Sequence, residues 1–318
     1  VVLHYLLPIY PAPFIVAGMG FSRLLSLLAS QRRVVRWSPL AWLLLVAVAG
    51  VQIWGTFRLH QLVAREATPG GFSTPLAMHL EAVEAAKAIW QREGGEVLVA
   101  SAGENPEIDG TAAIYDALLA GVPHRFVDVR QSALFPASPA VVLLSAETGD
   151  AAPAARPYFE AATERTEVPL RRGEGTVRLL AVAGAPLPAV ALDEPAVFAN
   201  WMRLVGYDPL SNGNNGAARW RLYWHPGDNP DPADYHIFNH LLDAVGNRVA
   251  QADAAAYAPW QWRAGDTVIS TFELELPDEV ARPLTMRTGF YRYPSLENVP
   301  VLDVALNPVA DAVTLPAE

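Results

Sequence analysis

The chain contains no cysteine among its 318 residues, and this absence excludes several kinds of chemistry at once. Without thiols it cannot form disulfides, hold zinc through cysteine ligands or use a thiolate nucleophile. Two long stretches, Val1–Phe21 and Pro39–Phe57, also lack every Asp, Glu, Lys and Arg. Each is close to the ~20 apolar residues that cross ~30 Å of hydrocarbon as a helix, so residues 1–60 are predicted to form a transmembrane helical hairpin.

The loop between these stretches lacks acidic residues but contains Arg23, Arg32, Arg33 and Arg36. Short basic loops stay on the cytoplasmic side, so we expect everything after about residue 60 to be extracytoplasmic. Residues 1–66 hold six arginines and one glutamate, a net charge of +5. Because the whole chain has a net charge of −10, the rest of it carries −15. An acidic region of this kind argues against a nucleic-acid partner, which would need a basic surface.

The first apolar stretch differs from an ordinary membrane helix in its prolines, Pro8, Pro11 and Pro13, and in His4 and Tyr5 at its outer end. Proline leaves backbone carbonyls that neighbouring helices or water must satisfy, so this stretch is expected to lie beside an extracytoplasmic cavity. The chain begins with valine inside an apolar run and lacks the features of a signal peptide. We therefore expect the C-terminal part of a longer polytopic protein, with a complete two-helix anchor as the alternative.

Residues 67–172 are predicted to form a small α/β domain. Helical spacing of apolar residues indicates helices at 75–92, 111–119 and 154–164, and short apolar runs indicate strands at 96–101, 125–129 and 140–145. This alternation favours a parallel, partly doubly wound sheet. The turn after the first strand reads Ala-Gly-Glu-Asn-Pro, and the chain has neither a Gly-x-Gly-x-x-Gly fingerprint nor a Walker sequence. We therefore predict no nucleotide site there.

Residues 175–310 have the pattern of an antiparallel β-sandwich, in which short strands alternate between inward and outward side chains. Strands are predicted at 177–182, 219–224, 236–242, 248–252, 267–276 and 284–291. Turns rich in Gly, Asn and Pro separate them. The predicted fold is thus a membrane α-helical hairpin followed by a small α/β domain and an antiparallel β-sandwich.

Two segments at opposite ends of the chain resemble one family. His4–Pro11 (HYLLPIYP) resembles the Arg/His-Tyr-x-Leu-Pro-x-x-Pro segment of bacterial GT-C type membrane glycosyltransferases, the protein mannosyltransferase and aminoarabinose transferase-like group. Asp234–Asp243 (DYHIFNHLLD) resembles the Asp-Tyr-Thr-Val-Phe-Val-His-Leu-Leu-Asp run in their C-terminal sandwich, and departs from it at Asn239. The same pattern continues in segments 205–208, 246–251 and 262–266.

The resemblance implies a parent enzyme in the bacterial plasma membrane that moves a sugar from a polyprenyl-phosphate donor to an extracytoplasmic glycan or protein acceptor. In that family the catalytic acidic residue lies in the first extracytoplasmic loop, so this chain would hold no catalytic residue and would be inactive alone. His4 and Tyr5 would contact the donor phosphate. This chain requires no cofactor of its own, and a divalent metal in the parent stays an open alternative.

A ring cluster at Tyr257, Trp260 and Trp262 could stack on sugars, because pyranose faces make apolar contacts with aromatic rings. Residues spaced by two share one side of a strand, so Trp260 and Trp262 are expected to point the same way. The alternative is that these rings belong to the core. A competing function is therefore a membrane-anchored module that binds carbohydrate or a partner without catalysis, and a third is a structural cap on the catalytic bundle.

Three polar sets could carry other chemistry, each with a simpler alternative. The histidines could bind a metal or be solvated, the aspartate-rich loop could bind calcium or be plain acidic surface, and the glutamate-rich loop could act as acid and base or be solvated. We predict no metal site. The sets are His236, His240 and Asp243; Asp228, Asn229, Asp231 and Asp234; and Glu104, Glu107 and Asp109.

Overall fold

One helix near the N-terminus is long and apolar enough to cross a membrane. The computed structural model describes residues 15, 18–20, 22, 23, 26, 38–68, 72–148, 152–213, 217–227, 233–277 and 279–318. Helix α2 (Ser38–Arg65) contains a candidate span of 24 residues, Trp42–Arg65. With ~1.5 Å of rise per residue this span exceeds the ~30 Å of a bilayer core. Most of Val1–Phe21, the other half of the predicted hairpin, lies outside the described residues.

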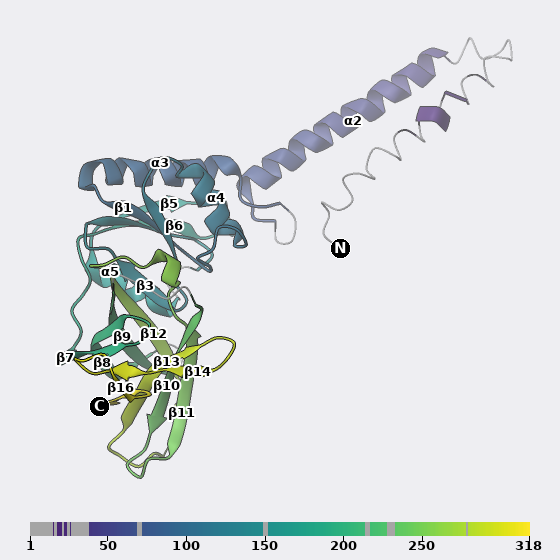
Figure 1. Cartoon of the computed structure of the whole chain (residues 1–318). Helices are drawn as coiled ribbons and strands as arrows, with labels where there is room; N and C mark the ends of the chain where they lie inside the picture. Colours follow the sequence, from purple (N-terminus) through teal and green to yellow (C-terminus); the bar gives the residue numbers. More distant parts are fainter. Residues whose placement is uncertain are drawn as a thin grey trace. The chain divides into compact units, whose positions relative to one another are not determined.

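The surface of α2 is apolar and uncovered. Every described side chain from residue 42 to residue 60 is exposed, including Trp42, Leu44, Ile53 and Phe57. A contiguous apolar surface of this kind suits lipid or a partner helix rather than water. The described part of the molecule is therefore compatible with membrane anchoring through α2 (Figure 1).

The C-terminal end of α2 is held by a short segment from much later in the chain. Residues 171–173 belong to the same compact unit as residues 1–75. The buried Arg171 guanidinium donates from Nη1 to the Val63 carbonyl at 2.7 Å and from Nη2 to the Phe72 carbonyl at 2.7 Å. The Arg172 N–H donates to the Arg65 carbonyl at 2.9 Å. These bonds satisfy carbonyls that a helix end otherwise leaves without partners.

The second compact unit, residues 76–170 and 174–318, begins with a mixed five-stranded sheet. Its order is β2-β1-β4-β6-β5, with β1 parallel to both β2 and β4 and with β6 antiparallel to β4 and β5. The strands are β1 (Glu96–Ser101), β2 (His124–Asp128), β4 (Ala140–Leu144), β5 (Ala162–Pro169) and β6 (Thr176–Val182). The helices are α3 (Leu76–Glu93), α4 (Gly110–Leu118), η3 (Pro153–Ala155) and α5 (Arg156–Ala161).

Alternate residues of β1, β4 and β6 enter two different hydrophobic clusters. Val97, Val99 and Leu143 pack with buried residues of α3 and α4, which cover one face of the sheet (Figure 1). Leu98 and Val142 point to the other face and join a second cluster. A strand buried on both faces needs an unbroken apolar run, which explains EVLVAS and AVVLL in these positions.

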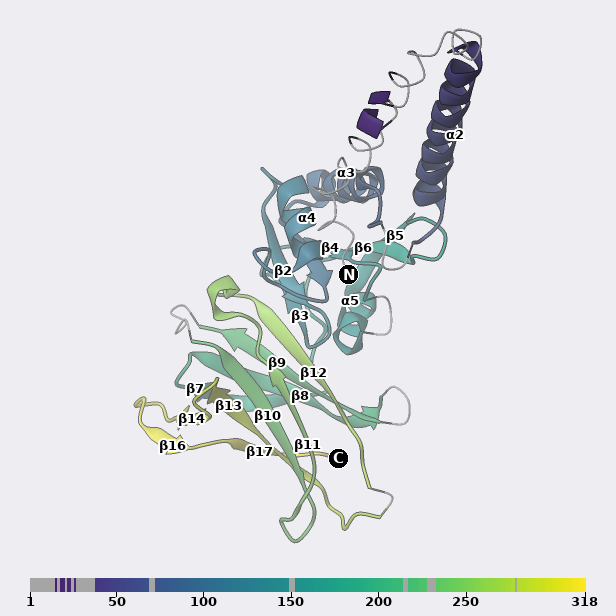
Figure 2. The same cartoon turned by 90° about the vertical axis from the view of Figure 1, so that its right-hand side faces the viewer.

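The remaining strands form two antiparallel sheets (Figure 2). Buried side chains of both sheets belong to this second cluster. The seven-stranded sheet has the order β16-β15-β7-β8-β9-β12-β3, and the five-stranded sheet has the order β11-β10-β13-β14 with β17 against β13. The bounds are β3 (Ser132–Phe135), β7 (Val190–Phe198), β8 (Met202–Asn212), β9 (Ala218–Pro226), β10 (Tyr235–Leu242), β11 (Arg248–Ala255), β12 (Thr267–Leu274), β13 (Thr285–Arg292), β14 (Glu297–Val299), β15 (Val301–Leu302), β16 (Pro308–Ala310) and β17 (Val313–Pro316). The 3₁₀ helix η5 (Pro259–Gln261) precedes β12.

The structure differs from the expected domain plan at three places. Strand β6 was expected in the antiparallel region after residue 175 but pairs with β4 and β5 in the mixed sheet. Strand β3, inside the expected α/β domain, pairs with β12 of the seven-stranded sheet. The helix expected at 154–164 ends at Ala161, where β5 begins. Residues 76–170 and 174–318 form one compact unit, in which one hydrophobic cluster includes residues of all three sheets.

Candidate functional site

Of the sequence-predicted site residues, the described structure covers Tyr257, Trp260 and Trp262. His4 and Tyr5 lie outside the described residues. Tyr257 and Trp262 are 2% and 7% exposed, and the Trp262 Nε1–H donates to the Tyr257 carbonyl at 2.8 Å. Only Trp260, 61% exposed, keeps the accessibility that stacking on a sugar requires. The reason is local, because η5 interrupts the alternation of a strand and turns Trp260 and Trp262 to different sides.

A second group of rings, which the sequence did not single out as a site, lies along the five-stranded sheet. Strand β10 contributes three rings at alternate positions, and β13 and its end contribute two tyrosines. We call this group the aromatic row; it consists of Tyr293, His236, Tyr291, Phe238 and His240. The period of two places these β10 residues on the face opposite to buried Ile237 and Leu241.

The rings of the aromatic row contact one another in order. His236 stacks on Tyr293 with centroids 4.8 Å apart and planes inclined by 20°. Its centroid is 5.3 Å from that of Tyr291, and the Tyr291 ring is 6.5 Å from Phe238. Phe238 lies 5.0 Å from His240. Such contacts stabilise the orientation of each ring, so the row is a preformed surface.

Accessibility changes along the row. Phe238 is 4% exposed and lies under the Arg287 guanidinium, 5.6 Å from the ring centroid. Tyr293 is 53% exposed, and His236 covers one of its faces. The Tyr293 end of the row is therefore the part that can accept a flat apolar ligand surface.

Hydrogen bonds fix the middle of the row. The Tyr291 hydroxyl lies 3.2 Å from His236 Nδ1 and 3.5 Å from a carboxylate oxygen of Asp253. Burial, together with the charge of Asp253, raises the pKa of Tyr291 above its ordinary value. Burial and the nearby Arg248 lower the pKa of His240. The phenol and the imidazole of His240 are thus favoured in their neutral forms, which suits contact with an uncharged ligand.

At the same end of the strands lies a pocket of about 200 Å³, which we call the Asn200 pocket. It is lined by residues of the β7–β8 turn, the start of β10, the end of β13 and β14, among them Asn200, Tyr235, Arg292, Glu297 and Asn298. The backbone register pairs Tyr235 with Arg292 and His236 with Tyr291. Successive residues of the same two strands therefore supply the pocket and the row.

The acidic loop after β1 does not form one acid–base cluster. Asp109 accepts a hydrogen bond from the Asn105 N–H at 2.9 Å and shapes the loop, while Glu107 is exposed. Glu104 differs, because burial, followed by repulsion from Asp128, raises its pKa to about 8. Backbone hydrogen bonds from Asp128 and Ala258 act in the opposite direction. Glu104 keeps its proton near neutral pH, and its neighbour Asp128 is paired with Arg130 at 2.5 Å.

The metal alternatives gain no support in the part of the chain that the structure describes, where no group of three or more His, Asp or Glu side chains could hold a metal ion. Asp243 instead accepts hydrogen bonds from the Val245 and Asn247 N–H groups at 3.0 and 2.8 Å, which lower its pKa and close the β10–β11 turn. Of the possible calcium ligands, Asp228, Asn229 and Asp231 lie outside the described residues.

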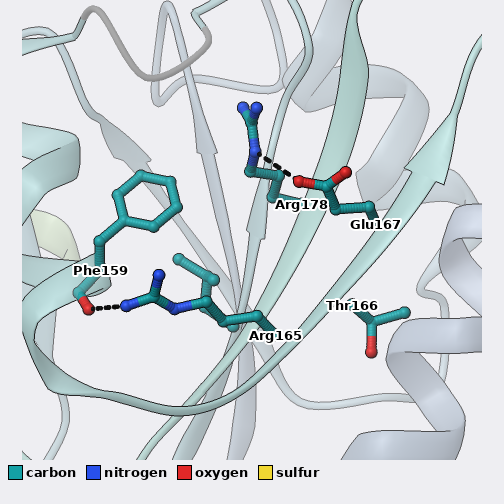
Figure 3. A pocket seen from close by; sticks show the side chains of 6 residues that line it. Phe159, Arg165, Thr166, Glu167 and Arg178 are labelled. Carbon is teal, nitrogen blue, oxygen red and sulfur yellow. Dashed lines mark hydrogen bonds and ion pairs between the residues drawn. The ribbon is translucent and has the colours of Figure 1, made fainter.

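A larger pocket of about 360 Å³ lies over β5 and β6 (Figure 3). Its charged groups already have partners. Arg165 donates to the Phe159 carbonyl at 2.6 Å and lies over the Phe159 ring, and Arg178 Nε contacts Glu167 at 3.3 Å. This pocket therefore offers a ligand fewer unmet hydrogen bonds than the Asn200 pocket does.

Comparison with known proteins adds no assignment. No family model matches the chain, and neither a curated protein nor a solved structure matches it. Function is therefore inferred from the site itself and from the sequence motifs.

Proposed function

We propose that this chain is the membrane-anchored, saccharide-binding C-terminal part of a GT-C type glycosyltransferase. The aromatic row carries the saccharide-binding part of this proposal, because its exposed ring, Tyr293, is preordered by stacking on His236. Aromatic faces bind the apolar face of a pyranose. We interpret the two antiparallel sheets with their shared cluster as a β-sandwich that presents this row on its outer face.

The parent enzyme would use a polyprenyl-phosphate sugar as donor and a glycan or protein outside the cytoplasm as acceptor. The motif resemblance at His4–Pro11 and Asp234–Asp243 supports this, and so does α2, which would place the following unit beyond the bacterial plasma membrane. Catalytic carboxylates would come from outside this chain. The row would then hold a saccharide near the enzyme rather than perform the transfer.

Binding by the row is tested by titrating the full chain, in detergent micelles, with a panel of neutral mono- and oligosaccharides. Tyr293→Ala is expected to weaken binding by about three- to tenfold, the effect of losing ~0.5–1.5 kcal/mol of ring contact. Trp260→Ala is the matched control, because it removes another exposed ring outside the row. Equal losses in both variants, or no binding to any saccharide, would contradict the proposal.

The enzymatic part is tested in the full-length protein by measuring sugar transfer from a polyprenyl-phosphate donor. His4→Ala and Tyr5→Phe are each expected to lower transfer without lowering expression, because both residues would contact the donor. If the complete gene product binds saccharide but transfers none, the second candidate function holds, a membrane-anchored binding module without catalysis. That candidate is favoured by the same observation, the open ring of Tyr293.

A further inference from the structure

The Asn200 pocket contains a buried polar group that the protein does not satisfy. Asn200 is 1% exposed and lies in the tight turn between β7 and β8. Its Oδ1 accepts a hydrogen bond from the Met202 N–H at 3.2 Å, which fixes the amide so that Nδ2 is the atom left over. Nδ2 has no hydrogen-bond partner in the described structure. A buried amide without a partner costs free energy, so a small movement of the turn that admits a ligand acceptor to this donor would be favoured.

The backbone of the same turn adopts a conformation that is unusual for a large side chain. Trp201 has φ of 68°, and its indole is 38% exposed. The conformation is held by the Trp201 N–H bond to the Phe198 carbonyl and by the Gly227 N–H bond to the Trp201 carbonyl, both 2.8 Å. A Cβ at Gly227 would stand 2.9 Å from the Trp201 carbonyl oxygen, so glycine is needed there. Positive φ at a bulky residue is found mostly where the surrounding structure imposes it, often at ligand sites.

The other polar groups of the pocket define the kind of ligand. Glu297 also lines the pocket and has a carboxylate that can accept, while Asn200 has an amide that can donate. The Arg292 guanidinium lies over the Tyr235 ring, 6.0 Å from its centroid, which places a cation and an aromatic surface in the same wall. A hydroxyl group donates and accepts at once, so neighbouring hydroxyls match this wall. Because Arg292 and Glu297 carry opposite charges, these two side chains give the pocket no net charge that would favour an anionic ligand over a neutral one.

We propose that the Asn200 pocket binds one ring of a neutral saccharide, with Asn200 Nδ2 donating to one ring hydroxyl and Glu297 accepting from a neighbouring hydroxyl. This inference rests on the proposed function and names its specificity site. A volume of about 200 Å³ is below the ~300–1,000 Å³ of pockets for drug-sized ligands, which fits a single ring. Tyr293 follows Arg292 directly in the chain, and successive strand residues point to opposite faces, so the pocket and the aromatic row are separate contact points at the same end of the sheet.

The test titrates the full chain in detergent micelles with D-glucose, D-galactose and D-mannose, with D-glucuronate as the acidic comparison. Asn200→Asp keeps the oxygen that accepts from Met202 but replaces the free donor by an acceptor, so hexose affinity should fall by about tenfold or more. Glu297→Gln should lower affinity by about three- to tenfold. Glu275→Gln, an exposed carboxylate outside the pocket, is the control and should leave affinity unchanged.

The outcomes separate this inference from the function on which it rests. If Tyr293→Ala weakens saccharide binding while Asn200→Asp and Glu297→Gln do not, the row binds saccharide and the pocket holds water only, which overturns the inference. Tighter binding of glucuronate than of the hexoses would also overturn it. No binding of any saccharide would reject the proposed function itself. Near-ultraviolet circular dichroism checks that each variant keeps its tertiary structure.

Discussion

Two regions of the second compact unit differ in whether their buried polar groups have hydrogen-bond partners. Around η5, the Arg125 guanidinium is 4% exposed and is bonded on every side, to Glu96 at 2.7 and 3.0 Å, to Asp266 at 2.5 and 3.0 Å and to the Gln261 carbonyl at 2.9 Å. In the Asn200 pocket, by contrast, a buried amide nitrogen has no partner in the described structure. The first arrangement holds two sheets together, whereas the second leaves a donor for the reversibly bound ligand that we propose.

Their aromatic residues differ in the same way. Tyr257 and Trp262, near η5, are buried, while Tyr293 at the end of the aromatic row is half exposed. A buried ring contributes apolar contacts to stability, whereas an exposed ring stacked on another ring contributes little to the core and remains open to a ligand. Accessibility together with unmet hydrogen bonds, rather than the number of rings alone, therefore marks a binding surface.

The largest expected effect comes from removing Arg125 from its buried hydrogen-bond network near η5. Burial alone would lower the pKa of Arg125, but its hydrogen bonds to Asp266 and Glu96 raise it. Arg125→Met should therefore leave Asp266 without its ion-pair partner and Glu96 with only the exposed Arg263, and cost about 3–5 kcal/mol of stability, measured by urea unfolding of the full chain in detergent. Saccharide affinity of the folded protein should not change.

Arg263→Met is the matched control for that experiment. Arg263 contacts the same Glu96 at 3.1 Å, but its side chain is 58% exposed, so its loss should cost less than about 1 kcal/mol. Equal effects of the two substitutions would contradict the distinction between buried and exposed members of the network.

A smaller effect is expected from pH at Glu104. Because its folded-state pKa is about 8, above the unfolded value of 4.5, its contribution to stability is full below pH 4.5 and is lost as the pH rises to 8. The free energy of unfolding of Glu104→Gln should equal that of the wild type at pH 4.5. At pH 9 it should be higher by on the order of 3 kcal/mol, which is below the limit of ~1.4 kcal/mol per unit of pKa shift. Unfolding free energies measured from pH 4.5 to 9 check this, with exposed Glu107→Gln as control; parallel curves for wild type and Glu104→Gln would refute it.

The smallest of these changes tests the support under the aromatic row. A Cβ added at Gly289 would stand 2.8 Å from the Phe238 ring and 3.0 Å from the Asp311 carbonyl oxygen. Gly289→Ala should therefore cost about 1–3 kcal/mol and weaken saccharide binding, because the shifted ring displaces its neighbours in the row. Gly184→Ala serves as control for binding, since nothing lies within 4 Å of its added Cβ. Saccharide affinity unchanged by Gly289→Ala would show that the deeper rings do not support Tyr293.

Much of the strand pattern was predictable from the sequence because it depends on burial. Runs such as those in β1 and β4 are buried on both faces, and the sequence shows them as unbroken apolar segments. Strands β5, β7 and β8 were missed for physical reasons. β5 alternates exposed charges, and β7 and β8 contain Pro195 and Pro209, which argue against a strand although irregular pairing accommodates them.

The candidate site was predictable only in part. The period of two correctly put His236 and His240 on one face of β10, but it could not show that β13 brings Tyr291 beside them, because strand register is a tertiary property. The same rule failed for Trp260 and Trp262, where a 3₁₀ helix replaces the strand. Asn200 has no signal in the sequence, since only the structure shows that its amide is buried and lacks a partner.

Hydrogen exchange of the full chain in micelles, with and without a saturating neutral saccharide, tests the central claim most directly. Our account predicts slower exchange in segments 199–201 and 293–300, where the Asn200 pocket and Tyr293 meet the ligand, and unchanged exchange in segment 257–262. Protection centred on Trp260, or no protection anywhere while the saccharide is bound, would contradict the assignment of the binding surface to this end of the five-stranded sheet.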